Sequence, residues 1–265
     1  MTMSALEYYE WIAEEYDEET KSSVMVAEDM VLFDFLKEEG LLRGKLLDAG
    51  CGTGLFLDYH YWPKWDIEHY IGYDFSEAML AKFAKKWPSF RPNIHKMSFL
   101  DDHDKFRGTF DSVISLYAGL NCLTRYEMSC AFRNLWECVK KGGTLCLMTY
   151  GNVAPEDRET SLHSIVSRKK GYTYTMIEDF VLYEWLRALD GSSNIRLIPF
   201  SQPIPPDEDE PSTGSDNMGP LLYHKTRIEE DLDECVLELQ TQHYSKKGGT
   251  LPKECSFYLC LADKF

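Results

Sequence analysis

A glycine-rich turn between a short apolar run and a helix is the part of this sequence best suited to bind a ligand. Residues 45–56 read KLLDAGCGTGLF. Lys45–Asp48 predict a short buried strand, and a helix is expected to begin near Thr53. Glycine allows positive φ and lets a ligand come close to the backbone. A strand, such a turn and a helix, in this order, form the ligand crevice of open α/β sheets.

The charge of Asp48 restricts which ligand this turn would accept. A dinucleotide would bring its pyrophosphate close to that carboxylate, and like charges at short range repel each other. A nicotinamide dehydrogenase is therefore the least favoured interpretation. A ligand with positive charge fits better, and S-adenosylmethionine carries a sulfonium and an ammonium beside a single carboxylate.

A second block of sequence supports a nucleoside ligand. Residues 70–80 read YIGYDFSEAML, which predicts a strand ending at the acid Asp74 and a helix capped by Ser76. Asp74 follows Gly54 by 20 residues. This is about the separation expected of an acid that accepts hydrogen bonds from ribose hydroxyls.

On these two blocks the chain resembles the class I, Rossmann-like S-adenosylmethionine-dependent methyltransferases of the small-molecule type. Their pattern of two hydrophobic residues followed by DAGCGTG is matched from Leu46 to Gly54, position for position. The resemblance covers residues 5–152 and 225–265, with specific motifs only in the first part. It implies an α/β fold with a seven-stranded, mostly parallel sheet, an antiparallel last strand and helices on both faces. It also implies S-adenosyl-L-methionine as the cofactor.

The resemblance further implies which residues contact the cofactor. Many small-molecule members have an N-terminal Tyr-x-x-x-Ala-x-x-Tyr-Asp helix that closes over the cofactor, and Tyr9, Ala13, Tyr16 and Asp17 match it. Packing of this helix on the core explains its apolar face equally well. The implied cofactor-binding residues are Tyr9, Tyr16, Asp48, Gly50, Cys51, Gly52, Asp74, Phe75, Met79, Ser98, Phe99, Leu116 and Tyr117. Three residues remain alternatives for binding the adenine amine, namely Ser98, Asp101 and Asp102.

The sequence does not identify a catalytic base. Methyl transfer from a sulfonium is an in-line displacement with an excellent leaving group, so orienting the nucleophile can lower much of the barrier. In family members the segment after the fourth strand faces the methyl group, and here residues 117–121 read YAGLN. The weak catalytic candidates are Tyr117, Asn121, His163 and His224, with His243 as a further histidine.

The same segment restricts the methyl acceptor. It is not the Asn/Asp-Pro-Pro-Tyr/Phe motif, which argues against amino methylation of DNA bases. It contains no Pro-Cys pair, which argues against cytosine C5 methylation, and it lacks the catalytic lysine of 2′-O-methyl RNA enzymes. A small molecule with an amine, a hydroxyl or an acidic carbon is therefore favoured. The alternatives are a protein or RNA methyltransferase and a non-catalytic S-adenosylmethionine-binding partner subunit.

Composition narrows the possible partners and compartment. The 265 residues are 44% hydrophobic, and the net charge is −16 at pH 7, which disfavours DNA or RNA because their backbones require clustered Lys and Arg. No apolar run is long enough to span a bilayer, and the N-terminus does not resemble a secretory signal. Eight cysteines are scattered without metal-ligand spacing, so we expect no metal site and a cytoplasmic location.

Changes in composition predict how the chain is divided. Residues 1–152 and 225–265 are expected to form the core, with 236–244 and 256–264 as its last two strands. Residues 153–224 are expected to be an inserted substrate lid, with a helix over 161–170 and an acidic, proline-rich loop at 203–216. Tyr183 and Trp185 are expected to lie over the methyl-transfer site.

Overall fold

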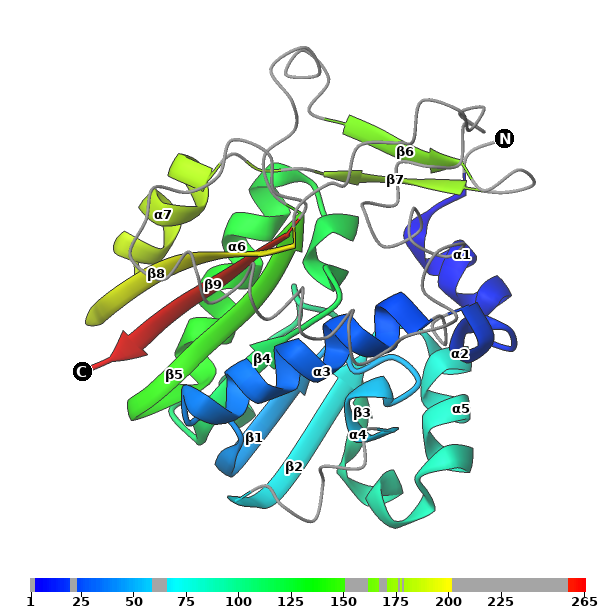
Figure 1. The fold of residues 1–265 in the computed structure, drawn as a ribbon, viewed down its shortest axis with the longest axis horizontal. Helices are drawn as coiled ribbons and strands as arrows, with labels where there is room; N and C mark the ends of the chain where they lie inside the picture. Colours follow the sequence, from blue (N-terminus) through cyan, green and yellow to red (C-terminus); the bar gives the residue numbers. More distant parts are fainter. Residues whose placement is uncertain are drawn as a thin grey trace.

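A mixed sheet of seven strands organises the molecule (Figure 1). The computed structural model describes residues 3–19, 23–58, 66–150, 162–166, 171–175, 177, 179–201 and 257–265. The sheet has the order β3-β2-β1-β4-β5-β9-β8. Its strands are β1 (Arg43–Ala49), β2 (Asp66–Asp74), β3 (Ile94–Lys96), β4 (Phe110–Ser115), β5 (Val139–Tyr150), β8 (Ser192–Ser201) and β9 (Phe257–Lys264).

Strand direction confirms the predicted fold class. β1 to β5 pair in parallel, whereas β9 runs antiparallel to both β5 and β8. The chain adds β2 and β3 on one side of β1 and then returns to place β4 on the other side. Such a reversal leaves a crevice beyond the carboxyl ends of the strands, which is where the glycine-rich turn lies.

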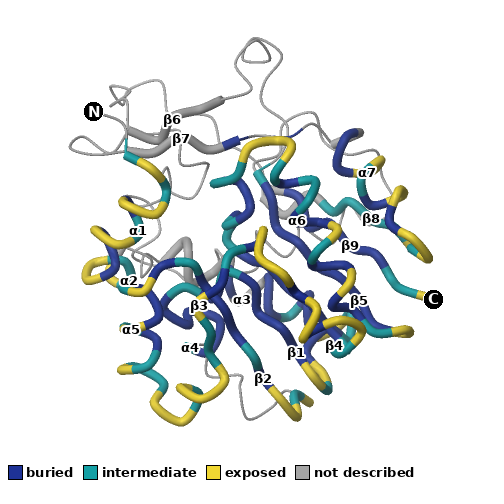
Figure 2. The backbone as a smooth tube through the Cα atoms, turned by 180° about the vertical axis from the view of Figure 1, so that it is seen from behind, coloured by how far each residue is buried: buried dark blue, intermediate teal, exposed yellow. Residues whose placement is uncertain are grey.

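Helices cover both faces of the sheet. They are α1 (Ala5–Ile12), α2 (Tyr16–Glu19), α3 (Ser23–Glu38), α4 (Leu55–Asp58), α5 (Glu77–Lys86), α6 (Arg125–Cys138) and α7 (Asp179–Arg187), with the 3₁₀ turns η2 (Pro88–Asn93), η3 (Asp104–Phe106) and η4 (Gly119–Cys122). Strand side chains alternate between two cores, so Leu46 packs with α3, α4 and α5, and Leu47 packs with α6 and α7. The central strands are therefore buried on both faces (Figure 2). None of the described helices is long and apolar enough to cross a membrane.

A glycine pair lies within a strand of the sheet. α6 begins with a capping box of Thr124 and Glu127 and ends at Cys138. Gly142 and Gly143 follow it within β5. A Cβ on Gly143 would lie 2.8 Å from the carbonyl oxygen of Asp111, so this glycine permits close approach to β4.

The predicted lid is corrected in its second half. β8 pairs with β9 as the edge strand of the main sheet, and Leu182 and Leu186 of α7 are fully buried in the core. Residues 179–201 therefore belong to the sheet and its helical layer, since their apolar side chains complete the α6 face. The acidic loop 203–216 and the predicted strand 236–244 lie outside the described residues.

The first half of the predicted lid contains a hairpin in place of the expected helix. β6 (Leu162–Val166) pairs antiparallel with β7 (Gly171–Thr175) as a separate two-stranded sheet. Residues 171–175 read GYTYT, and Tyr and Thr favour strands. β7 lies against η4 and α1, beyond the carboxyl ends of the parallel strands (Figure 1).

Candidate functional site

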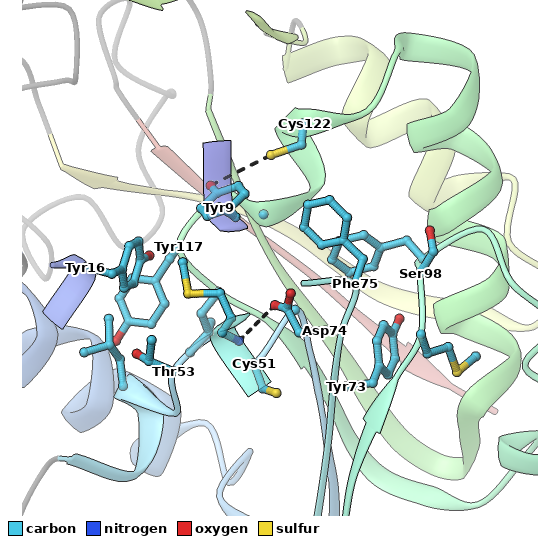
Figure 3. Close-up of a pocket in the computed structure, with 18 residues that line it drawn as sticks. Tyr9, Tyr16, Cys51, Thr53, Tyr73, Asp74, Phe75, Ser98, Tyr117 and Cys122 are labelled. Carbon is cyan, nitrogen blue, oxygen red and sulfur yellow. Dashed lines mark hydrogen bonds between the residues drawn. The ribbon is translucent and has the colours of Figure 1, made fainter. Parts of the chain in front are cut away.

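A cavity opens at the carboxyl ends of the first four strands (Figure 3). It encloses about 610 Å³, including the open space at its mouth. Its walls come from α1, α2, the turns after β1 to β4, and η4. The lining residues are Tyr9, Tyr16, Gly50, Cys51, Gly52, Thr53, Leu55, Tyr73, Asp74, Phe75, Met79, Met97, Ser98, Phe99, Leu116, Tyr117, Gly119 and Cys122.

The glycine-rich turn forms one wall, and its two central glycines have different surroundings. Gly50 has φ +79°, and a Cβ there would lie 2.9 Å from Cζ of Phe99. Gly52 has φ +53°, and a Cβ there would meet no protein atom within 4 Å. The amides of Gly50 and Cys51 both donate to the carbonyl of Tyr73, at 2.8 and 2.9 Å. The turn is thus fixed to β2, with open space beside Gly52.

Asp74 places a buried carboxylate beside that open space. Its Oδ2 accepts a hydrogen bond from the amide of Gly52, and its Oδ1 accepts one from the amide of Ser76, both at 2.9 Å. Burial raises the pKa of Asp74 to about 6, although these backbone donors act in the opposite direction. Each carboxylate oxygen can accept more than one hydrogen bond. Asp74 therefore retains capacity for the hydroxyls of a ligand.

Asp48 does not line the cavity. Its Oδ2 accepts a 2.7 Å hydrogen bond from the hydroxyl of Tyr70, because the alternation along β1 turns Asp48 toward the face that holds Tyr70. Burial raises the pKa of Asp48 to about 7, the Tyr70 bond lowers it and the charge of Asp74 raises it. Direct contact between Asp48 and a ligand in the cavity, expected from the sequence, is not part of this arrangement.

The N-terminal helices place two tyrosine side chains on the opposite wall. Tyr9 of α1 contacts both Phe75 and Tyr16 edge-on, with ring centroids 5.9 and 6.3 Å apart. Its hydroxyl accepts a weak 3.9 Å hydrogen bond from the thiol of Cys122. Burial and the charge of Asp74 raise the pKa of Tyr16, so its phenol stays neutral. Both tyrosines of the N-terminal pattern thus line the cavity (Figure 3).

Polar bonds attach these helices to the crevice. Glu10 accepts hydrogen bonds from the hydroxyl of Ser76 at 2.9 Å and from the amide of Ala78 at 3.3 Å. Asp17 accepts a 2.5 Å bond from the hydroxyl of Thr53, which belongs to the glycine-rich turn. The helices therefore contact the same two βα turns that form the opposite wall.

The three alternatives after β3 differ in their position relative to the cavity. Ser98 lines the cavity beside Phe99. Asp101 accepts a 2.7 Å hydrogen bond from the amide of Ser98, and Asp102 accepts one of the same length from the amide of Asp104. Both acids are exposed and stabilise the turn, so Ser98 is the one of the three that faces the cavity.

The segment after β4 has an unusual backbone. Tyr117 and Ala118 have φ of +57° and +55°, and left-handed conformations of non-glycine residues are concentrated at functional sites. Tyr117 lines the cavity. Asn121 does not line the cavity, because its side-chain amide forms hydrogen bonds with other parts of the chain. His163 lies on β6 without a described side chain, and His224 and His243 lie outside the described residues.

Sequence reasoning missed several lining residues. They are Thr53, Leu55, Tyr73, Met97, Gly119 and Cys122. Thr53, Tyr73 and Met97 directly follow or precede predicted residues at the ends of adjacent parallel strands, so extending the strand-end rule would have found these three. Cys122 carried no such signal. Among the described residues, no group of His, Cys, Asp and Glu side chains could hold a metal ion.

Tyr183 and Trp185 do not lie at the cavity. The ring of Trp185 packs on Phe132 of α6, with centroids 5.4 Å apart, and Tyr183 is exposed to solvent. α7 lies at the α6 side of the sheet (Figure 1). Its amphipathic spacing reflects packing on α6, so the predicted position of both aromatics over the methyl-transfer site is wrong.

Comparisons with known proteins agree with this geometry. Residues 46–143 match the family model described as a methyltransferase domain. A structure titled "DhpI-SAH complex structure" is similar at a TM-score of 0.59 and 15% identity, covering 98% of this chain and 95% of that one. A SAM-dependent methyltransferase from Archaeoglobus fulgidus is similar at a TM-score of 0.54 and 13% identity, covering 89% of this chain and 94% of that one. No sequence among curated proteins matches the chain.

A third similar structure shows that this fold does not fix one chemistry. It is titled "Crystal Structure of the [4+2]-Cyclase SpnF", with a TM-score of 0.52, 16% identity and coverage of 89% of this chain and 81% of that one. The assignment of this chain therefore depends on the match over 46–143 and on the motif residues gathered at the cavity. Residues 46–143 therefore form a methyltransferase domain, and the fold around them is the class I, Rossmann-like fold that the two sequence blocks predicted.

Proposed function

We propose that the protein transfers a methyl group from S-adenosylmethionine to a small molecule, at a nitrogen, oxygen or carbon nucleophile. The observation that carries this proposal is the meeting of two features in one cavity. The glycine-rich turn leaves open space at Gly52, and the buried carboxylate of Asp74 lies beside it. Together they can accept a nucleoside with a short, charged substituent.

The lining residues divide into three groups for such a ligand. Gly52 leaves room for the methionine part, Asp74 accepts hydrogen bonds from the ribose, and the rings of Phe75 and Phe99 flank an adenine. Tyr9, Tyr16 and Tyr117 surround the remaining end with neutral aromatic rings. The face of an aromatic ring attracts cations, which suits a sulfonium.

Orientation and exclusion of water are the main contributions of this chain to the reaction. Bound S-adenosylmethionine supplies a methyl group activated by a sulfonium. The acceptor forms a bond to that methyl as the bond to sulfur breaks, the electron pair stays on sulfur, and the acceptor's proton is released to solvent or a nearby base. The Tyr117 segment, fixed in a left-handed conformation after β4, orients the acceptor against the methyl.

A small acceptor is favoured by enclosure and by charge. α1 and η4 flank the cavity, and β7 lies against both. The net charge of −16 opposes binding of nucleic acid. A protein or RNA acceptor is the second candidate, and a non-catalytic partner subunit is the third.

Labelled methyl transfer separates these candidates. The enzyme is incubated with S-adenosylmethionine labelled on its methyl group and, separately, with a metabolite extract, a protein extract and total RNA. We expect label in the metabolite fraction with wild type and none with Gly52→Val. Label in protein or RNA would support the second candidate, and binding without label in any pool would support the third.

We also propose that the protein works in the cytoplasm. Cys51, Cys138, Cys146 and Cys260 are buried free thiols, and such thiols persist where disulfides are kept reduced. Cell fractionation tests this proposal, and recovery of the protein outside the cytoplasmic fraction would contradict it.

A further inference from the structure

The side chain of Asn121 connects three segments that are distant in sequence. Its Nδ2 donates a 2.5 Å hydrogen bond to the carbonyl of Thr175 at the end of β7. Its Oδ1 accepts a 3.1 Å bond from the amide of Tyr150 at the end of β5. The chain leaves the main sheet after Tyr150 and completes the β6–β7 hairpin at Thr175. One amide therefore holds together both ends of the connection that contains the hairpin.

Asn121 also belongs to a wall of the cavity without facing it. Its neighbours in η4, Gly119 and Cys122, line the cavity, whereas Asn121 itself is completely buried. η4 thus lies between the cavity and the hairpin. The side-chain nitrogen and oxygen of Asn121 are both bonded to backbone groups outside the cavity. This explains why Asn121 is not a catalytic residue, although its position after β4 suggested one.

The hairpin contacts two elements of the cavity wall. β7 lies against η4 and against α1, and α1 carries Tyr9, which lines the cavity. A buried bond to a backbone carbonyl is expensive to leave unmade, so Asn121 favours one position of β7. Any displacement of β7 would change the cavity wall formed by η4 and α1.

We propose that Asn121 is a positioning residue that fixes the β6–β7 hairpin over the acceptor end of the cavity and thereby sets acceptor binding. The proposal rests on the proposed function, because it assigns an acceptor to that end. It predicts that weakening the bond from Asn121 to Thr175 changes acceptor binding while the binding of cofactor is retained.

Asn121→Asp breaks one bond of the pair and keeps the other. A carboxylate can still accept the hydrogen bond from the amide of Tyr150, but it cannot donate to the carbonyl of Thr175. Asn134→Asp is the matched control, because Asn134 Nδ2 also donates to a backbone carbonyl, that of Phe99, at 2.9 Å. The two variants make the same chemical change, but only Asn121→Asp removes a hydrogen bond to β7. Asn121→Leu, which removes both bonds at similar volume, is the second variant if the carboxylate prevents folding.

Hydrogen exchange on the intact enzyme with S-adenosylhomocysteine bound gives the first measurement. In Asn121→Asp we expect faster exchange in 162–175 by roughly fivefold or more, with unchanged protection of the Tyr150 amide. In Asn134→Asp we expect unchanged exchange in 162–175. Equal exchange of the hairpin in wild type and in Asn121→Asp or Asn121→Leu would overturn the proposal.

Methyl transfer to increasing amounts of metabolite extract gives the second measurement. For Asn121→Asp we expect half-maximal labelling at roughly fivefold or more extract, with the same plateau and unchanged affinity for S-adenosylhomocysteine. A lower plateau with unchanged half-saturation would overturn the proposal. If wild type does not bind S-adenosylhomocysteine, the proposed function itself fails, and this outcome is distinct from normal binding with an unaltered hairpin.

Discussion

The two ends of the cavity are held in different ways. At the crevice end, Gly50 and Cys51 bond the carbonyl of Tyr73, and Gly52 bonds Asp74, so the contacts join neighbouring parallel strands. At the roof end, formed by α1, η4 and β7, side chains bridge distant segments. Glu10 reaches Ser76 across 66 residues, and Asn121 reaches Thr175 across 54.

This difference indicates a division of labour. The crevice end consists of backbone in fixed conformations with one buried carboxylate, which suits a constant ligand. The roof depends on a few side-chain bonds, so single substitutions can adjust it without disturbing the sheet. We therefore expect substitutions at the crevice to affect the cofactor strongly, and substitutions at the roof to affect it weakly.

The largest effect is expected for Gly52→Val. A branched side chain would occupy the open space beside the turn, where a Cβ meets no protein atom within 4 Å, and would exclude the ligand from that space. We expect a folded protein whose affinity for S-adenosylhomocysteine falls by about 100-fold or more, measured by isothermal titration.

The pair Gly52→Ala and Gly108→Ala separates loss of ligand space from backbone strain. Gly108 has φ +61° and, like Gly52, no atom within 4 Å of a built Cβ. Both variants should lose about 1–2 kcal/mol of stability from the left-handed backbone. Only Gly52→Ala should lose affinity for the ligand, and equal affinity in both would show that the ligand does not occupy this space.

Asp74→Ala is expected to have the next largest effect. Removal of the carboxylate leaves two ribose hydroxyls without a charged acceptor, so binding of S-adenosylhomocysteine should weaken by about 1–3 kcal/mol. Titration calorimetry measures this change. Unaltered binding would mean that the ribose lies elsewhere.

The pH dependence of binding sharpens the same prediction. The pKa of Asp74 is raised to about 6 by burial, and hydroxyl donors favour its charged form. Affinity should therefore rise as pH increases from 5 to 7, with release of a proton on binding. Asp74→Asn should remove this dependence, and an unchanged profile in the variant would assign it to another group.

A smaller effect is expected for the stability of the unliganded enzyme through Asp48. Its folded-state pKa is raised to about 7 from an ordinary value of 3.8. The folded state therefore keeps a proton that the unfolded state loses within this range. Its stabilising effect is complete below about pH 4 and is lost as the pH rises through about 7. The free energy of unfolding, measured in urea, should fall with rising pH more steeply in wild type than in Asp48→Asn. The difference in slope should reach up to about 1.4 kcal/mol per pH unit.

Tyr70→Phe tests the cause of that slope. The Tyr70 hydroxyl bond lowers the pKa of Asp48, so its removal should raise this pKa further. The fall in stability should then extend to higher pH. A slope that is identical in wild type, Asp48→Asn and Tyr70→Phe would show that other groups cause it.

The smallest effect is expected at the attachment of the N-terminal helices. Asp17 pairs with Lys86 at 2.9 Å, with both side chains 25% exposed, and accepts from Thr53 of the glycine-rich turn. Asp17→Asn should make S-adenosylhomocysteine dissociate faster, with an activation free energy lower by no more than about 1 kcal/mol. Stopped-flow measures the dissociation rate. Glu14→Gln is the control, because Glu14 pairs with Lys82 while its own side chain is 85% exposed. This variant should leave the dissociation rate unchanged.

The crevice end could be predicted from sequence because its residues are local. The turn at Gly50 and Gly52, and Asp74 at the end of the next strand, follow from strand and glycine patterns within 25 residues of each other. β8 could not be recognised as the edge strand, since only pairing with β9 distinguishes it from another strand. The role of Asn121 also depends on tertiary contacts, because Thr175 is brought to it by the fold alone.

A crystal structure of the enzyme with S-adenosylhomocysteine would test the central claim most directly. We predict that both ribose hydroxyls lie within hydrogen-bond distance of the Asp74 carboxylate, about 2.5–3.0 Å. The sulfur should point toward Tyr117, and the methionine part should lie beside Gly52. A ligand bound outside this cavity, or one with its ribose away from Asp74, would contradict the account.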